Sequence, residues 1–139
     1  MPDRDYSSRS PVEKLGIKEG NAVILESAAW PLDPVLSEAV LRRAGREVAA
    51  LGEPIDTALV TVDDSTDAES TLRHWKARLR PTGAIWLLSP KRGCPGYIDQ
   101  RLLIDAGLAA GLVDHKVCSV SETVSAMRFV IRLRDRSPR

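Results

Sequence analysis

Two kinds of hydrophobic pattern alternate along the chain. Short apolar runs, which are typical of buried strands, occupy 22–25, 56–62 and 84–88. Between them lie two longer stretches, 33–52 and 66–79, in which apolar residues recur every three or four positions. That spacing places the apolar side chains on one face of a helix. Strands that alternate with helices predict an α/β sheet with parallel strands.

Capping signals mark where the first two helices begin. Ser10-Pro11-Val12-Glu13 has the form of a capping box with proline in the first turn, and it predicts a short helix through Leu15. Asp33-Pro34 begins the second helix by the same logic. We expect this helix to end at Gly52 and to bury one apolar face, which consists of Leu36, Val40, Ala44, Val48 and Leu51.

Two further helices are expected in the second half of the chain. Thr66 and Glu69 have the spacing of a capping box, and the helix that follows has an inner face made of Ala68, Leu72, Trp75 and Leu79. After it, the residues 81–83 (Pro-Thr-Gly) predict a turn that reverses the chain into the strand 84–88. Asp99 is expected to cap a last helix that ends at Gly111.

The pattern changes after Gly111. The segments 113–121 and 126–133 are strand candidates separated by only a few polar residues, and so short a gap joins only antiparallel neighbours. The second segment alternates with a period of two, with Met127, Phe129, Ile131 and Leu133 between Arg128, Arg132 and Arg134. The predicted fold is a three-layer α/β domain whose mostly parallel sheet is closed by a C-terminal antiparallel strand pair.

Length and composition favour a single domain. The 139 residues are enough for one core, and we assign 10–133 to the domain, 1–9 to a disordered tail and 134–139 to a basic C-terminal tail. The tails are interpreted as solvated, with docking on an acidic partner as the alternative for the basic one. A net charge of +1 creates no field that would recruit nucleic acid or a membrane surface, and we expect neither as a partner.

The cysteines and the apolar runs bear on the compartment. No apolar run approaches the ~20 residues of a membrane span, and the polar N-terminus does not resemble a signal peptide. Cys94 and Cys118 lack the spacing of a metal site, so we interpret both as reduced thiols in a cytoplasmic protein and expect no metal ion. His74 and His115 are predicted to be surface or half-buried histidines rather than catalytic bases.

Three segments resemble class I S-adenosylmethionine-dependent methyltransferases. Residues 15–24 look like the lead-in to the first strand of that superfamily, 79–88 like its Leu-x-Pro-Gly-Gly turn and following strand, and 111–113 like the start of its terminal antiparallel pair. The resemblance implies a Rossmann-like fold. It is compressed, because the chain has no room for the second and third strands of the full fold, one of which carries the acidic residue that holds the cofactor ribose.

The chain resembles more closely a bacterial, mainly actinobacterial, family described only as a domain of unknown function. Its opening Pro-x-Glu-Lys-Leu-Gly-Ile-Lys-x-Gly motif matches 11–20, and its Gly-x-Ile-Trp strand ending in Pro-Lys matches 83–91. Its Gly-Leu-Val-Asp-x-Lys-Val-Cys-x-Val-x-Glu-Thr ending matches 111–123. The family usually continues with Trp and Ser-Gly-Leu where this chain has 124–127 (Val-Ser-Ala-Met). The resemblance implies a fold and no reaction.

The candidate ligand site is the crevice at the carboxyl ends of the parallel strands, where α/β sheets bind ligands. Three loops are expected to meet there. Lys91-Arg92-Gly93 precedes a helix N-terminus and is the best candidate for binding an anion. The alternative is that these are ordinary solvated loop residues. The predicted ligand residues are Glu26, Ser27 and Trp30 from the first loop, Asp63 from the second, and Ser89, Lys91 and Arg92 from the third.

The loop 26–30 argues against ordinary use of S-adenosylmethionine, so we expect no cofactor. It has no glycine, whereas that cofactor needs a close backbone approach. Trp30 is interpreted as a plug for the vacant position or as a platform that stacks a ligand. The leading functional prediction is a non-catalytic binding or regulatory domain. The alternatives are a small enzyme or sensor that binds an anionic ligand in the crevice, and a homodimeric interaction module.

Overall fold

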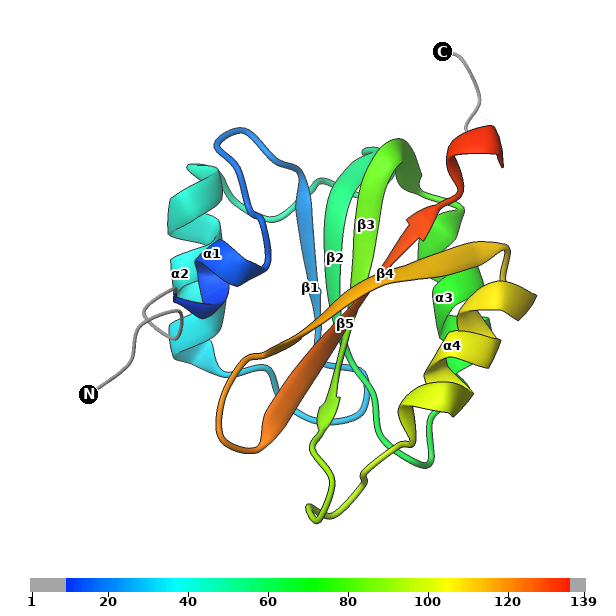
Figure 1. Ribbon diagram of the computed structural model, residues 1–139. Coiled ribbons are helices and arrows are strands. Elements are labelled where there is room, and N and C mark those ends of the chain that lie inside the picture. Colours follow the sequence, from blue (N-terminus) through cyan, green and yellow to red (C-terminus); the bar gives the residue numbers. More distant parts are fainter. Residues whose placement is uncertain (1–9, 136–139) are drawn as a thin grey trace.

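The computed structural model describes residues 10–135 as a five-stranded sheet between two pairs of helices (Figure 1). The strands lie in the order β1-β2-β3-β5-β4. Their bounds are β1 Val23–Glu26, β2 Ile55–Thr61, β3 Leu79–Pro90, β4 Leu112–Ser119 and β5 Val124–Ile131. The predicted tails, 1–9 and 134–139, lie outside the described residues except for Arg134 and Asp135, which belong to a 3₁₀ turn.

Strand pairing confirms the predicted sheet. β1 pairs with β2, and β2 with β3, in parallel; in the first pair Val23 lies opposite Thr57. β5 pairs antiparallel with β3 on one side and β4 on the other, with Phe129 opposite Ile85. Only β5 therefore runs against the other strands. The hairpin forms because few residues connect β4 to β5, whereas helical crossovers connect the parallel strands.

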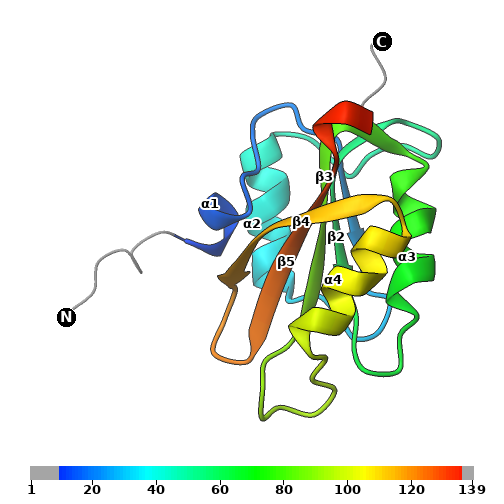
Figure 2. The ribbon, with the colours of Figure 1, turned by 45° about the vertical axis from the view of Figure 1, so that its right-hand side comes forward.

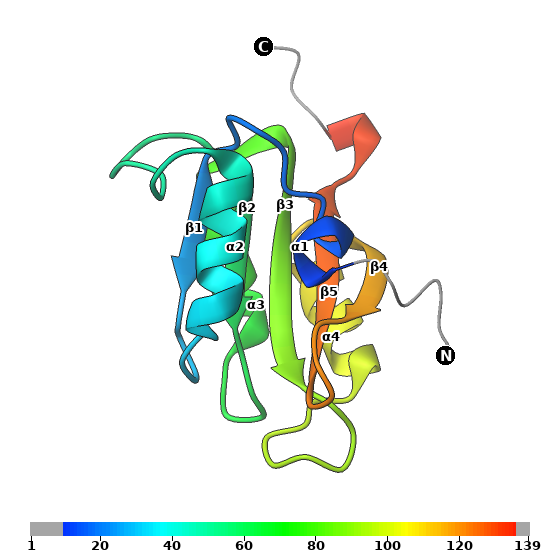
Figure 3. The ribbon, with the colours of Figure 1, turned by 90° about the vertical axis from the view of Figure 1, so that its left-hand side faces the viewer.

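Four helices cover the two faces, α1 (Pro11–Lys14) and α2 (Pro34–Ala44) on one side and α3 (Ala68–Lys76) and α4 (Gln100–Ala109) on the other (Figures 1 and 3). Three predicted caps are confirmed. The capping box of α1 is complete, with the Ser10 hydroxyl accepting from the Glu13 N–H, and Asp33 and Asp99 cap α2 and α4. No helix within residues 10–135 is long and apolar enough to cross a bilayer.

Three predicted boundaries are wrong. α2 ends at Ala44, because Gly45 adopts a left-handed φ of 72° and caps the helix; Val48 and Leu51 are consequently exposed. The cap of α3 is Asp67 rather than Thr66, since the Asp67 carboxylate accepts from the Ser70 N–H. The segment 79–83 forms no turn: Leu79 pairs with Ile55, and β3 runs through the proline.

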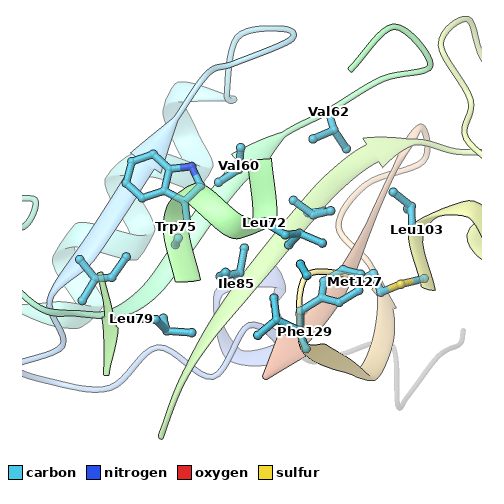
Figure 4. Close-up of a cluster of buried hydrophobic side chains, with 14 of the residues drawn as sticks. Val60, Val62, Leu72, Trp75, Leu79, Ile85, Leu103, Met127 and Phe129 are labelled. Atoms are coloured by element: carbon cyan, nitrogen blue, oxygen red, sulfur yellow. The ribbon is translucent and has the colours of Figure 1, made fainter. Parts of the chain in front are cut away.

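Each face of the sheet carries its own hydrophobic core. The core beneath α3 and α4 includes Leu72, Trp75 and Phe129, and Figure 4 shows these side chains converging between helices and strands. Gly107 lets α4 approach closely, because a Cβ there would lie 2.5 Å from the Phe129 ring. The core beneath α1 and α2 includes Trp86, which is 1% exposed and whose indole N–H donates to the Leu15 carbonyl.

Candidate functional site

The predicted crevice lies at the lower end of the molecule, where the loops after β1, β2 and β3 emerge. The β3–α4 loop and the β4–β5 turn lie side by side at this end (Figure 2), and the Lys91 N–H donates to the Thr123 carbonyl across them at 2.8 Å. The predicted ligand residues do not form one cluster. The structure divides them among a closed loop after β1, a self-contained turn after β2 and an open hollow after β3.

The loop after β1 is closed by hydrogen bonds to the end of β2. The Trp30 indole Nε1 donates to the Val62 carbonyl at 2.9 Å. The buried Thr61 hydroxyl donates to the Trp30 carbonyl at 2.7 Å and accepts from the backbone N–H groups of Ala29 and Trp30. The Ser27 hydroxyl accepts from the Leu32 N–H at 3.0 Å and shapes the rest of the loop. The polar groups of Ser27 and Trp30 are thus engaged in fixing the loop.

The half-buried Trp30 side chain also forms a wall of an apolar pocket of about 190 Å³, the Trp30 pocket. α1 and α2 supply the facing walls, and the β4–β5 turn closes one side through Val120 and Val124. Trp30 packs against the core beneath α1 and α2. The ring therefore both bridges the ends of β1 and β2 and lines a pocket, which fits the plug and the stacking platform alike.

Asp63, after β2, holds its own turn. Its carboxylate accepts from the Ser65 N–H at 2.9 Å and from the hydroxyls of Ser65 and Thr66 at 2.7 and 3.1 Å. These bonds, first the one from the Ser65 hydroxyl, lower the pKa of Asp63. Glu26 lies apart from the other predicted residues. It is exposed and borders a shallow hollow of about 330 Å³ beside α3, with His74 on the far wall.

Three of the predicted residues share a hollow: Ser89, at the end of β3, and Lys91 and Arg92, in the loop after it, line a space of about 660 Å³, the carboxyl-edge hollow. The Lys91 ammonium donates to the Ser119 hydroxyl at 2.6 Å, and the Arg92 guanidinium lies 5.4 Å from the centroid of the Tyr97 ring. Each cation is therefore oriented by a neighbour on the wall of the hollow, and Arg92 remains exposed to solvent.

The remaining walls of the carboxyl-edge hollow are mixed in character. Ile98, Leu103 and Met127 provide an apolar floor, while Ser125, Gln100 and the carboxylate of Asp99, the cap of α4, provide polar groups. Cys118 also lines the hollow, and burial raises the pKa of its thiol. Cys94 and Cys118 are both free, as predicted. Cations beside an apolar floor suit an organic anion with one charged group and an apolar body.

Sequence reasoning missed the contribution of the β4–β5 hairpin to this hollow. Ser119 is 28 residues from Lys91, and Ser125 lies beyond the turn. The available signal was the short gap between the last two strands, which predicts the hairpin but not which loop it contacts. Among residues 10–135, no cluster of three or more His, Cys, Asp or Glu side chains could hold a metal ion.

Comparison with solved structures gives methyltransferase folds at low identity. Fibrillarin from Aeropyrum pernix, in complex with natively bound S-adenosyl-L-methionine, matches with a TM-score of 0.54 and 14% identity over 86% of this chain and 73% of its own. Precorrin-6y C5,15-methyltransferase from Geobacter metallireducens matches with a TM-score of 0.53 and 11% identity, over 88% of this chain and 86% of its own. A SAM-dependent methyltransferase from Aquifex aeolicus matches with a TM-score of 0.53 and 11% identity, over 86% of this chain and 87% of its own. These likenesses show the fold alone.

The sequence comparisons agree with the second resemblance found above. A search of the curated proteins finds no match to this chain. A family model, described as "Protein of unknown function (DUF3052)", matches residues 12–133, which is nearly the whole described chain. This protein therefore belongs to the DUF3052 family, proteins of unknown function built, in this member, on a methyltransferase-like α/β fold.

Proposed function

We propose that this chain is a binding or regulatory domain that holds a small organic anion in the carboxyl-edge hollow. The observation that carries the proposal is the pair of oriented cations: Lys91 is fixed by Ser119, and Arg92 by Tyr97, on one wall of the same hollow. A carboxylate on the ligand would accept from both cations, and its apolar body would lie on Leu103 and Met127.

The closed loop after β1 supports a role other than ordinary methyl transfer. In the position where a methyltransferase presents a glycine turn, this chain presents Trp30, tied to β2 through Thr61 and Val62. We infer that the ligand site has moved along the sheet edge, from the end of β1 to the end of β3. A cytoplasmic location is part of the proposal, because two free thiols are typical of a reducing compartment.

The test is a titration followed by backbone amide shifts. The probes are benzoate and octanoate, which combine one carboxylate with an apolar body, and inorganic phosphate, which has no apolar body. We expect saturable shifts with the two carboxylates in residues 89–103 and 117–127. A Lys91→Ala, Arg92→Ala double variant should weaken binding at least tenfold, since each charge-assisted hydrogen bond contributes roughly 1.5–3 kcal/mol.

The matched control is an Arg42→Ala, Arg73→Ala double variant. It also removes two positive charges, but both lie on exposed helix surfaces, four residues from a carboxylate partner. Its affinity for the probes should stay within twofold of the wild type. Shifts that cluster elsewhere, equal weakening in both double variants, or no saturable binding of either carboxylate would overturn the proposal.

A further inference from the structure

A second hollow lies at the opposite edge of the sheet, near the amino ends of β2 and β3. It has a volume of about 420 Å³ and lies on the face that α1 and α2 cover. Its walls come from the end of α1, the segment between α1 and β1, the starts of β2 and β3, and the hairpin strands β4 and β5. None of the ligand residues predicted from the sequence lines it. We call it the amino-edge hollow.

Positive charge dominates the walls of this hollow. Four cationic side chains and one histidine line it, from the end of α1, the α1–β1 segment, β4 and β5: Lys14, Lys18, Lys116, Arg128 and His115. Asp56 is the one acidic residue among the lining residues. The whole chain has a net charge of only +1, so the excess is a local feature of this hollow.

Strand register assembles two of these cations in one row. On β5, Arg128 lies opposite Trp86 of β3 on one side and opposite Lys116 of β4 on the other. Residues at one register position across neighbouring strands point to the same face. The Lys116 ammonium lies 6.0 Å from the centroid of the Trp86 ring. An Arg128 Nη1 lies 2.9 Å from His115 Nδ1; since guanidinium only donates, the imidazole accepts.

The acidic residue, Asp56, makes its hydrogen bond and its ion pair with groups that do not line the hollow. One Asp56 oxygen accepts from the Ala22 N–H at 2.8 Å, and the other lies 3.3 Å from the Arg80 guanidinium, which is not among the lining residues. Lys18 and Lys116 are exposed, so their ammonium groups are free to turn towards a ligand. Lys14 already donates to the Ser119 carbonyl at 3.2 Å.

We propose that the amino-edge hollow binds a small phosphate compound that carries at least two negative charges, such as a diphosphate group. One carboxylate would leave most of the local positive charge uncompensated, whereas a diphosphate offers several acceptor oxygens to cations that converge from separate elements. A nucleic-acid strand fits less well, because it would extend beyond the hollow over a surface of nearly balanced charge. The site is separate from the carboxyl-edge hollow in residues and in ligand class.

The experiment titrates the full chain with inorganic pyrophosphate in calorimetry and in amide-shift mapping. We expect saturable binding, with shifts in residues 14–21, 82–86, 115–116 and 128. A Lys18→Ala, Lys116→Ala double variant should weaken binding at least tenfold, because two charge-assisted contacts are lost. Lys14 and Arg128 are left intact, since both make contacts within the fold. Lys18→Arg, Lys116→Arg should retain affinity within threefold.

The variants of the first hollow are the matched control. Lys91→Ala, Arg92→Ala should leave pyrophosphate affinity within twofold, and Lys18→Ala, Lys116→Ala should leave benzoate binding unchanged. Both variants are checked for native amide dispersion and thermal unfolding. An ADP titration identifies the source of the phosphate: tighter binding than pyrophosphate indicates a nucleotide-like ester, and equal binding indicates that the diphosphate alone is recognised.

Three results would overturn this inference: no saturable pyrophosphate binding, equal weakening by both double variants, or benzoate binding in the amino-edge hollow as tightly as pyrophosphate. The first two results leave the proposal for Lys91 and Arg92 intact, because benzoate and pyrophosphate report on different residues. Benzoate binding in the amino-edge hollow would count against both proposals.

Discussion

The ends of β1 and β3 lie on the same edge of one sheet, yet one is closed and the other open. At the end of β1, the loop bonds inward: Thr61 and Val62 of the neighbouring strand take up the polar groups of Trp30. At the end of β3, the loop bonds outward to the hairpin, through Lys91 and Ser119, and a hollow of about 660 Å³ remains between them. The partner that each loop finds, rather than its place at a strand end, decides whether a site can form.

Among the substitutions that test this difference between the two strand ends, Trp30→Ala should have the largest effect on stability. Removing the indole deletes a half-buried ring and leaves the Val62 carbonyl without its donor. The free energy of unfolding should fall by about 3 kcal/mol, the lower end of the range for a buried aromatic residue, because the ring is partly exposed. Urea unfolding followed by far-UV circular dichroism measures it.

Trp30→Phe separates the ring from its hydrogen bond. It retains most of the packing but loses the bond to Val62, so a loss of about 1 kcal/mol is expected. If Trp30→Ala unfolds within 1 kcal/mol of the wild type, the ring does not hold the two strand ends together, and the closed description of this loop is wrong.

A smaller effect is expected at Asp63, whose turn also belongs to the closed side. Because the pKa of Asp63 is lowered by its bonds to Ser65 and Thr66, the unfolded chain binds its proton more readily than the folded chain. Stability from this carboxylate is therefore present above the unfolded pKa and is lost as pH falls through the folded pKa. Asp63→Ala should be less stable than the wild type at neutral pH, and the difference should shrink in acid.

Asp64→Ala is the control for this pH dependence. Asp64 is an exposed neighbour, and its removal leaves the three hydrogen bonds of the Asp63 carboxylate in place. Urea unfolding at a series of pH values should show that the stability difference between the wild type and Asp64→Ala does not shrink in acid. A difference between the wild type and Asp63→Ala that is constant from neutral pH into acid would contradict the assignment.

The sequence predicts the sheet well because its signals are local. Apolar runs identify β1 to β3, and a short polar gap makes β4 and β5 a hairpin, independently of distant contacts. The errors arise where local signals compete. Gly45 ends α2 although the apolar spacing continues to Leu51, and β3 absorbs the Pro-x-Gly segment because Leu79 finds a partner in Ile55.

The candidate sites are harder to predict because they depend on pairings between distant residues. That Lys91 and Arg92 line a hollow at the sheet edge could be expected, since they follow a strand and precede a helix. The amino-edge hollow could not, because it brings Lys18 next to Lys116 and Arg128. Those residues have no motif in common; Lys116 and Arg128 meet through the register of β4 and β5, and Lys18 reaches the hollow from the segment after α1. Register is set by the whole face of a sheet rather than by any one segment.

No measurable effect is expected in the last test of the closed loop after β1: neither the wild type nor Trp30→Ala should bind S-adenosylmethionine. Removing the indole empties the position at the end of β1, but the loop 26–30 still has no glycine, and Thr61 still holds its backbone against β2. The backbone therefore cannot adopt the close turn that the cofactor needs. Calorimetry at millimolar cofactor should give only heats of dilution for both proteins. Saturable binding tighter than about 1 mM, or about −4 kcal/mol, by the wild type would show that the indole stacks the cofactor rather than replaces it. The same result for Trp30→Ala alone would show that the ring, and not the missing glycine, keeps the cofactor out.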